Sequence, residues 1–515
     1  MKKLTLLLLG LLGTLAIHAR TDRPRLVVEI VVGSMRAEDL ERYEPNFGED
    51  GFRRLMTGGT RFTDARYDCQ QTTTPVSLAT LSTGAMPSTH GVVGTCWQDY
   101  TTNAAVSLTA GRQGPGPYRL FAPTLGETIL RQLPGSRTAT VAAEAASAVV
   151  AGGRTQNVFW LDSARCDWTT SPWYAAELPE WVARSNRERY NLSYIASEWR
   201  TLHERSRYLN ARHWDIVLPG RTKRERDETG AGLLFAKTDF DRMLYTPAGN
   251  SAVLGFAKQL IAQCGLGSDD KTDLMTLCLD SSRRIAELYG PESVEVEDMY
   301  YRLDRDLADF LTFLFAQVDD ALVILTSDHG TSPAAGETER FNPRQFEVIL
   351  NGFLNVRYGT GDWVTAYNDK SVWLNHNLIY ERGLDLSDVQ NEVAIFAMQF
   401  DGVSHALAAT AMRTSYFGSG YAQRMQNSFY PRRSGDVILN FQPGWIEQRE
   451  RCVSSSGSMY GYDTAVPLLF YGAGIGPQRI DRRVEMTSVA PTVARLLGIS
   501  APAASEGTPL EEVIE

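Results

Sequence analysis

The sequence has few cysteines, no long basic run and, beyond its first residues, no long apolar run. A low cysteine count with wide spacing excludes a disulfide scaffold and a CxxC metal knuckle, although one or two disulfides remain possible in an oxidising compartment. Asp plus Glu outnumber Lys plus Arg by 61 to 51, so the formal net charge is −10. This acidic balance gives no support for a nucleic-acid or anionic-membrane partner. The six cysteines are Cys69, Cys96, Cys166, Cys264, Cys278 and Cys452.

The composition is that of a globular protein. Apolar residues make up 43% and charged residues 22% of the 515 positions, which excludes a disordered chain. The 43 glycines and 22 prolines follow no period, which excludes collagen-like and low-complexity sequence. At roughly 100–200 residues per domain, the length allows two to four domains or one large α/β domain with insertions.

The N-terminus has the pattern of a secretory signal peptide. Two lysines precede an apolar run from Leu4 to Ile17, and Ala19 precedes Arg20. We expect residues 1–19 to be removed and residues 20–515 to be exported to the periplasm or the cell envelope. A membrane anchor is the alternative, but the run falls short of the roughly 20 residues that span a bilayer. No later segment is long and apolar enough to span one.

Strands alternate with helices along the chain. Leu26–Val32 is a β-branched run typical of a buried parallel strand, and residues 321–326 form a second such run that ends at Asp328 and His329. Residues 294–318 have apolar side chains at helical spacing. The order predicts an α/β fold, with a mostly parallel central sheet and helices on both faces. Further predicted elements are a helix at 50–58, a strand at 467–472 and a helix at 487–497.

Two stretches break this alternation and are predicted to be cap insertions over the strand ends. They cover about 157–271 and about 336–451, and no Pro/Ser/Gly-rich linker marks either as a separate domain. In the first stretch, the aromatic cluster from Trp160 to Trp181 is predicted to be cap core. The basic run from Arg221 to Arg226 is predicted to be a solvated surface.

Several segments together resemble the alkaline phosphatase superfamily, and most of all the exported, phosphate-irrepressible alkaline phosphatases that use a threonine nucleophile. The resemblance implies an alkaline-phosphatase-like fold over most of the chain. It rests on segments that keep the family's order, namely LVVEIVVGSMR (26–36), TTTPVSLATLSTGAMPSTHGVVG (72–94), YGPESVEVEDMYYRLDRDL (289–307), LTSDHG (325–330), YGYDTAVPLLFYG (460–472) and VAPTVARLLG (489–498).

The resemblance also implies a chemistry. In this family two Zn²⁺ ions, each held by Asp and His ligands, clamp the attacking and leaving oxygens of a phosphate monoester. A metal-bound hydroxyl is the nucleophile, and an Asn, a Lys and an Arg hold the phosphoryl oxygens. The nucleophile maps to Thr74, and two ligands of its metal map to Asp328 and His329.

The other positions are replaced. The third ligand of the nucleophile's metal maps to Gly33, and the ligands of the other metal map to Arg283, Glu287 and Ala465. The phosphate-binding Asn, Lys and Arg map to Thr95, Glu144 and Ala146. A guanidinium cannot deprotonate to bind a metal. Glu144 is expected to repel a substrate anion by about 4 kcal/mol at ~4 Å and an effective dielectric near 20.

The sequence therefore predicts a pseudoenzyme with a scaffold or binding role and no cofactor, with a cell-envelope protein as a candidate partner. The alternative is a weak hydrolase of phosphate or sulfate esters, with Thr74 as nucleophile and one divalent metal, zinc, at Asp328 and His329, to which Glu287 is a candidate further ligand. Purely structural roles are the alternatives to both functional interpretations. They are an Arg283 pair with Asp328 and His329, a helix cap at Thr74, an ion pair at Glu287 and a structural turn at His90.

Overall fold

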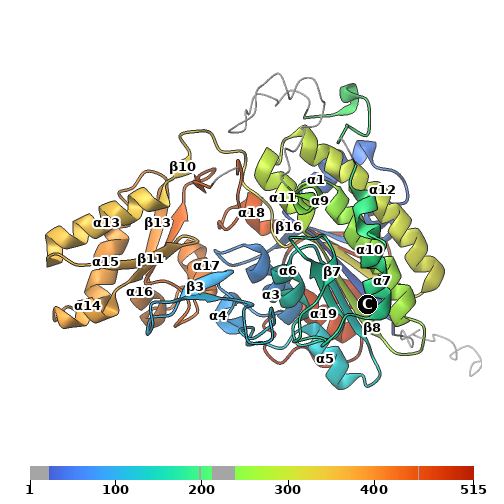
Figure 1. The fold of residues 1–515 in the computed structure, drawn as a ribbon, viewed down its shortest axis with the longest axis horizontal. Coiled ribbons are helices and arrows are strands. Elements are labelled where there is room, and N and C mark those ends of the chain that lie inside the picture. Colours follow the sequence, from blue (N-terminus) through green and yellow to red (C-terminus); the bar gives the residue numbers. More distant parts are fainter. Residues whose placement is uncertain (1–22, 197–198, 211–237, 450–451, 515) are drawn as a thin grey trace, which may run out of the picture.

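The computed structural model describes residues 23–196, 199–210, 238–449 and 452–514. The predicted signal peptide (1–19) and the basic run at 221–226 lie outside the described residues. A nine-stranded sheet runs through the body of the molecule (Figure 1). In sheet order its strands are β17 (Gln478–Glu485), β2 (Thr60–Arg66), β16 (Ala465–Gly472), β9 (Leu322–Thr326), β1 (Leu26–Val32), β8 (Asp273–Leu279), β5 (Thr138–Ala142), β6 (Val158–Leu161) and β7 (Trp168–Thr169).

The central strands are parallel, and helices cover both of their faces. The strands β9, β1, β8, β5 and β6 all run in one direction, whereas β16 and β7 run antiparallel to their neighbours. Every residue of β1 and β9 is buried, as the apolar runs predict. Glu29 is the polar exception in β1; burial raises its pKa to about 7, and one carboxylate oxygen accepts a 3.0 Å hydrogen bond from Thr276.

Two hydrophobic layers cover the sheet. Alternate residues of β1 enter different layers, so that Val28 and Ile30 pack in one and Val27 and Val31 in the other. The first layer includes α10 (Ala248–Cys264), α11 (Asp280–Tyr289) and α12 (Val294–Gln317), and also α1 (Asp39–Tyr43) and α2 (Phe52–Gly58). The second includes α3 (Thr74–Thr83), α5 (Leu125–Gln132), α6 (Ala145–Gly152) and α19 (Val489–Leu496). The helices predicted at 50–58, 294–318 and 487–497 are therefore present as α2, α12 and α19.

A separate unit forms from the second predicted insertion. It has its own hydrophobic core and lies beside the body, to the left in Figure 1. Its antiparallel sheet consists of β11 (Val364–Asn368), β12 (Ser371–Leu374), β14 (Val437–Phe441) and β13 (Val403–Ala408). Its helices include α13 (Pro343–Tyr358), α14 (His376–Glu381), α15 (Leu386–Ala397), α16 (Ala409–Thr414) and α17 (Gly420–Ser428), and β10 (Arg340–Phe341) pairs with β15 (Ile446–Glu447). We call this unit the cap.

The first predicted insertion differs from the prediction, because much of 157–271 belongs to the body. β6 and β7 extend the central sheet, and α10 packs in its first hydrophobic layer. Trp168 stacks on Phe256 of α10 with ring centroids 4.2 Å apart. The aromatic cluster is therefore part of the core of the body rather than of a cap. The strands β6 and β7 of this stretch are too short to be recognised from the sequence pattern.

The structure also bears on the expected disulfides and on the expected absence of a membrane span. All six cysteines have free thiols, so the one or two disulfides that the sequence allowed are not formed. Among the helices of the described residues, none combines the length and the apolar character needed to cross a bilayer.

Candidate functional site

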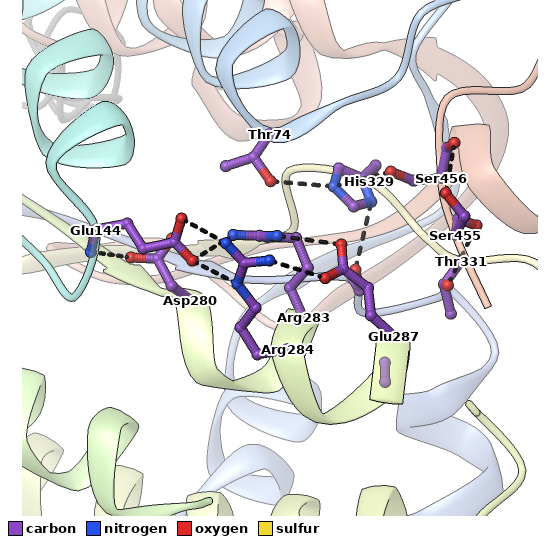
Figure 2. Close-up of polar contacts among 12 residues, drawn as sticks. Thr74, Glu144, Asp280, Arg283, Arg284, Glu287, His329, Thr331, Ser455 and Ser456 are labelled. Carbon is purple, nitrogen blue, oxygen red and sulfur yellow. Dashed lines mark hydrogen bonds and ion pairs between the residues drawn. The ribbon is translucent and has the colours of Figure 1, made fainter. Parts of the chain in front are cut away.

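The predicted site residues converge because they follow neighbouring parallel strands. Gly33 follows β1, Asp328 and His329 follow β9, Arg283 lies in the first turns of α11 after β8, and Glu144 follows β5. Parallel strands end at one edge of a sheet, where ligands bind in open α/β folds. Figure 2 shows Glu144, Arg283 and His329 at this edge, together with Thr74 at the start of α3.

One half of the site holds Thr74, Asp328 and His329, to which the resemblance assigns the nucleophile and two metal ligands, and it is tied to the backbone. The Thr74 hydroxyl donates to Asp328 Oδ2 at 2.6 Å and lies 3.2 Å from His329 Nε2. Asp328 Oδ1 accepts the backbone N–H groups of Ser34 and His329, both at 2.9 Å. His329 Nδ1 is 2.6 Å from the Gly330 carbonyl, which can only accept, so Nδ1 carries the proton and Nε2 faces Thr74.

Thr74 does not cap α3, as one interpretation of the sequence suggested. The helix begins at Thr74, Thr73 is the residue before it, and neither side chain makes a capping hydrogen bond. The Thr74 hydroxyl is committed to Asp328 instead.

His90 has the structural role that was expected. Its Nδ1 accepts the Val92 N–H at 3.1 Å, and its Nε2 lies 3.1 Å from the Thr80 hydroxyl. Burial lowers the pKa of His90 to about 3, so the ring is neutral.

The other half of the site is a partly buried network of two arginines and two glutamates, in which Arg283 is the buried member. Arg283 donates to Glu144 at 2.5 Å and to Glu287 at 3.1 Å, and it is only 8% exposed. Arg284 donates to the same two carboxylates at 2.8 and 3.2 Å (Figure 2). Burial alone would raise the pKa of both glutamates, but the attraction of the two guanidinium groups outweighs it and lowers them. The network is internally neutral.

This network corrects two predictions. Arg283 bonds Glu144 and Glu287, not Asp328 or His329. Glu144 is not an uncompensated carboxylate, because two guanidinium groups neutralise it, so the predicted repulsion of about 4 kcal/mol from an anion does not apply. Glu287 is an ion-pair partner whose two oxygens each accept from an arginine.

The remaining replaced positions offer no metal ligand. A Cβ on Gly33 would lie 2.9 Å from Arg283 Cβ and 3.1 Å from the Leu279 carbonyl oxygen, so a side chain does not fit there. Ala465 begins β16, and its carbonyl accepts the Ala37 N–H. Thr95 and Ala146 line the cavity described below.

Asp280 was not predicted as a site residue, and it bonds the backbone of Glu144 in the network. Its carboxylate accepts the Glu144 N–H at 2.9 Å and the Ser147 hydroxyl at 2.6 Å. Burial, reinforced by the nearby Glu144 charge, raises the pKa of Asp280 to about 7. Its position directly after β8 was the available signal, because polar residues at strand ends gather at this edge.

A polar cavity of about 380 Å³ separates the body from the cap at this site. Thr74, His329 and the arginine–glutamate network line one side, and Lys370 and Arg449 line another. The cap residues were missed because nothing in the sequence indicates where the turn between β11 and β12 meets the body. The other lining residues are Gln71, Thr73, Pro75, Thr95, Ala146, Ser147, Tyr245, Asp369, Cys452, Ser455, Ser456 and Gly457.

The residues present do not fit a pair of metal ions. At the second metal's positions stand a guanidinium, a carboxylate bonded to two arginines, and an alanine. Within the described parts of the chain, no three His, Cys, Asp or Glu side chains form a group that could hold a metal. Three donor atoms of the retained half do converge, since Asp328 Oδ2, His329 Nε2 and Thr74 Oγ1 lie 2.6–3.3 Å apart.

Comparisons with known proteins identify the family. The sequence profile of type I phosphodiesterases / nucleotide pyrophosphatases matches residues 27–463. Alkaline phosphatase PafA of Elizabethkingia meningoseptica is 30% identical over 98% of this chain and 97% of its own, and alkaline phosphatase PhoV of Synechococcus elongatus is 27% identical over 96% and 93%. The crystal structure of wild-type PafA superposes with a TM-score of 0.87 at 27% identity, covering 96% of this chain and 99% of that one, which confirms the predicted fold. The chain therefore belongs to the type I phosphodiesterase / nucleotide pyrophosphatase family, within the alkaline phosphatase superfamily.

Proposed function

We propose that this protein is an exported pseudoenzyme, which keeps the fold of an alkaline phosphatase and uses its cavity for binding instead of hydrolysis. The observation that carries the proposal is the placement of Arg283. Its guanidinium stands at a predicted metal-ligand position and bonds two glutamates that stand at a second ligand position and at a phosphate-binding position.

The chemistry of these groups supports the proposal. Two-metal hydrolysis needs ligands that can be deprotonated around both ions, and a guanidinium remains protonated in proteins. The phosphate-binding cations are replaced by Glu144 and Ala146, and Glu144 already accepts three hydrogen bonds from arginine. The replacements satisfy one another, which is expected of a site that has gained a structural role.

A turnover assay tests this proposal. The purified protein, supplied with zinc, is assayed with p-nitrophenyl phosphate, bis-p-nitrophenyl phosphate and p-nitrophenyl sulfate. We expect no hydrolysis that depends on Thr74, so wild type and Thr74→Ala give equal rates. Thr63→Ala, in β2 and outside the cavity lining, is the matched control. Turnover that disappears in Thr74→Ala and persists in Thr63→Ala would refute the proposal.

The convergence of Thr74, Asp328 and His329 favours a second candidate, a single-metal ester hydrolase. One bound divalent ion would activate the Thr74 hydroxyl, but the ion that stabilises the leaving oxygen would be missing, which is worth several kcal/mol of barrier. Glu287 does not join this set, because its oxygens accept from Arg283 and Arg284. Stoichiometric zinc, with activity that a chelator removes and zinc restores, would support this candidate over the first.

The export part of the proposal rests on the N-terminal pattern. We expect mature protein in the envelope fraction to begin at Arg20, and mass spectrometry of its N-terminal peptide checks this. A binding role also calls for a ligand or an envelope partner. Affinity capture from an envelope fraction, with a cytoplasmic fraction as control, tests for the partner.

A further inference from the structure

The charged wall that the body contributes to the cavity is internally balanced. It is the network in which Arg283 and Arg284 each pair with both Glu144 and Glu287 (Figure 2). These side chains keep some accessible surface, since 20% of Glu144, 17% of Glu287 and 29% of Arg284 are exposed. The wall therefore presents carboxylate oxygens and N–H groups side by side.

The cap side of the cavity is balanced in the same way. Arg449 donates to Asp369 Oδ1 and to Glu447 Oε2, both at 2.8 Å. Burial lowers the pKa of Lys370, and the nearby carboxylates of Glu447 and Asp463 oppose this shift. Each cation of the lining thus lies near a carboxylate, and each carboxylate of the lining is bonded to an arginine. An incoming ion finds no unpaired counter-charge among the described residues of the lining.

The ion pairs leave hydrogen-bonding groups unused on both sides. Nε and one terminal nitrogen of Arg449 donate to no described residue, and 49% of this side chain is exposed. Asp369 Oδ2 accepts no hydrogen bond from a described residue, and each Glu287 oxygen accepts only one. A carboxylate oxygen can accept two hydrogen bonds. Free donors and free acceptors are therefore neighbours in this lining.

A hydroxyl group uses both kinds of partner at once, because it donates one hydrogen bond and accepts up to two. A carboxylate only accepts and an ammonium only donates. An ionic ligand would use half of what the lining offers, and it would compete with an existing pair for its counter-charge. The lining therefore favours a ligand that is rich in hydroxyl groups and has no charge.

Tyr245 adds an aromatic ring to the lining. It directly follows α9 (Asp239–Leu244), and its half-buried side chain packs against the first hydrophobic layer and lines the cavity. Its hydroxyl makes no hydrogen bond to a described residue. Burial raises the pKa of Tyr245, and the charges of Arg284, Glu287 and Glu144 also act on it, which places its hydroxyl near the network. An aromatic face beside a few polar groups is typical of small-molecule sites and suits the C–H groups of a sugar ring.

We propose that the cavity binds a neutral monosaccharide, with its hydroxyl groups bonded to the ion-paired walls and its ring against Tyr245. The volume of about 380 Å³ lies at the small end of the roughly 300–1,000 Å³ of ligand pockets, which favours one sugar unit over a longer chain. This proposal rests on the proposed function, because a phosphatase would use the same cavity for its substrate.

Titration calorimetry at pH 7.5 tests the proposal. The probes are D-glucose, D-galactose and D-mannose, each compared with its own uronate and its own 2-amino sugar, which add one negative or one positive charge to the same ring. We expect at least one neutral sugar to bind, severalfold more tightly than both of its charged counterparts. L-Glutamine, a zwitterion without net charge, should not displace it. The proposal would be overturned if no neutral sugar binds at about 50 mM, or if a charged counterpart or L-glutamine binds as tightly.

A first set of variants locates the sugar. Tyr245→Leu removes the aromatic face and the hydroxyl, and we expect it to weaken sugar binding at least tenfold. Tyr245→Phe removes only the hydroxyl and should weaken binding severalfold, which keeps the test available if Tyr245→Leu does not fold. Tyr416→Leu, at an exposed tyrosine of the cap outside the lining, is the matched control and should bind as wild type does. Unchanged sugar affinity in both Tyr245 variants would overturn the assignment.

A charge variant tests the balance of the lining. Asp369 lies in the turn between β11 and β12 with a φ of 44°, a conformation that asparagine adopts readily, so Asp369→Asn should keep the turn. The change leaves Arg449 with Glu447 alone, and we expect the uronate to bind severalfold more tightly than it binds to wild type. Unchanged uronate affinity would contradict the role of charge balance. Failure of the proposed function is seen separately, as turnover that depends on Thr74.

Discussion

The two halves of the site differ in what holds their side chains. In the retained half, Asp328 accepts two backbone N–H groups and the Thr74 hydroxyl. In the rebuilt half, Arg283, Arg284, Glu144 and Glu287 bond mainly to one another. Side chains that accept backbone hydrogen bonds stabilise the fold even without catalysis. Side chains whose only role is to bind metal or phosphate can be replaced together without this cost. The survival of Asp328 and His329 is therefore weak support for activity.

The largest expected effect comes from breaking the rebuilt half. Arg283→Met leaves two half-buried carboxylates with Arg284 alone. Removing one partner of a fully buried ion pair costs about 3–5 kcal/mol, and the partial exposure of both glutamates lowers this cost. We expect a loss of stability near the lower end of this range in urea unfolding followed by fluorescence. Arg187→Met removes an exposed pair with Glu180 and should leave the unfolding free energy nearly unchanged. Equal losses in the two variants would show that the network does not stabilise the site.

The next largest effect comes from breaking the retained half. Asp328→Ala deprives the buried N–H groups of Ser34 and His329 of their acceptor, at an expected cost of about 2–3 kcal/mol in unfolding free energy. Asp328→Asn keeps a side-chain oxygen and should lose clearly less. If both variants are as stable as wild type, the structural explanation for the persistence of Asp328 fails.

A smaller effect is expected where the two halves touch. Gly33→Ala places a Cβ 2.9 Å from Arg283 Cβ, and overpacking of this kind should destabilise the protein by about 1–2 kcal/mol. Gly352→Ala, where the new Cβ meets nothing within 4 Å, is the matched control and should not destabilise. A Gly33→Ala variant as stable as wild type would mean that α11 shifts readily away from β1.

The smallest expected effect concerns pH. Burial raises the pKa of Asp280 from its usual value near 4 to about 7, so between these values the folded state holds a proton that the unfolded state has released. This contribution to stability is fully present below pH 4 and is lost as the pH rises towards 7. Asp280→Asn should therefore show a shallower decline of unfolding free energy between pH 4 and 7. Parallel pH profiles of wild type and variant would contradict this assignment.

Much of the fold could be predicted from the sequence, and less of the site. The runs that form β1 and β9 are continuous and apolar, and the residues after them gather at one edge by topology alone. The pair of Arg283 with Glu287 has i,i+4 spacing within one helix and was within reach of the sequence. The pair with Glu144 could not be predicted, because it depends on how α11 faces the residues before α6 across the sheet edge. Lys370 could not be placed either, since the contact between the β11–β12 turn and the body is set by tertiary packing. The local sequence pattern also led to the wrong prediction of a cap insertion at 157–271. In the structure, the short strands of this stretch belong to the central sheet, and α10 belongs to the hydrophobic layer that packs on it.

The close contact between Gly33 and Arg283 has a consequence for any attempt to build a two-metal site into this chain. Restoring aspartate at both positions would still leave two Cβ atoms 2.9 Å apart, since every residue except glycine has this atom. Placing aspartate at both positions thus requires a shift between β1 and α11 as well as new side chains. No single substitution accomplishes both.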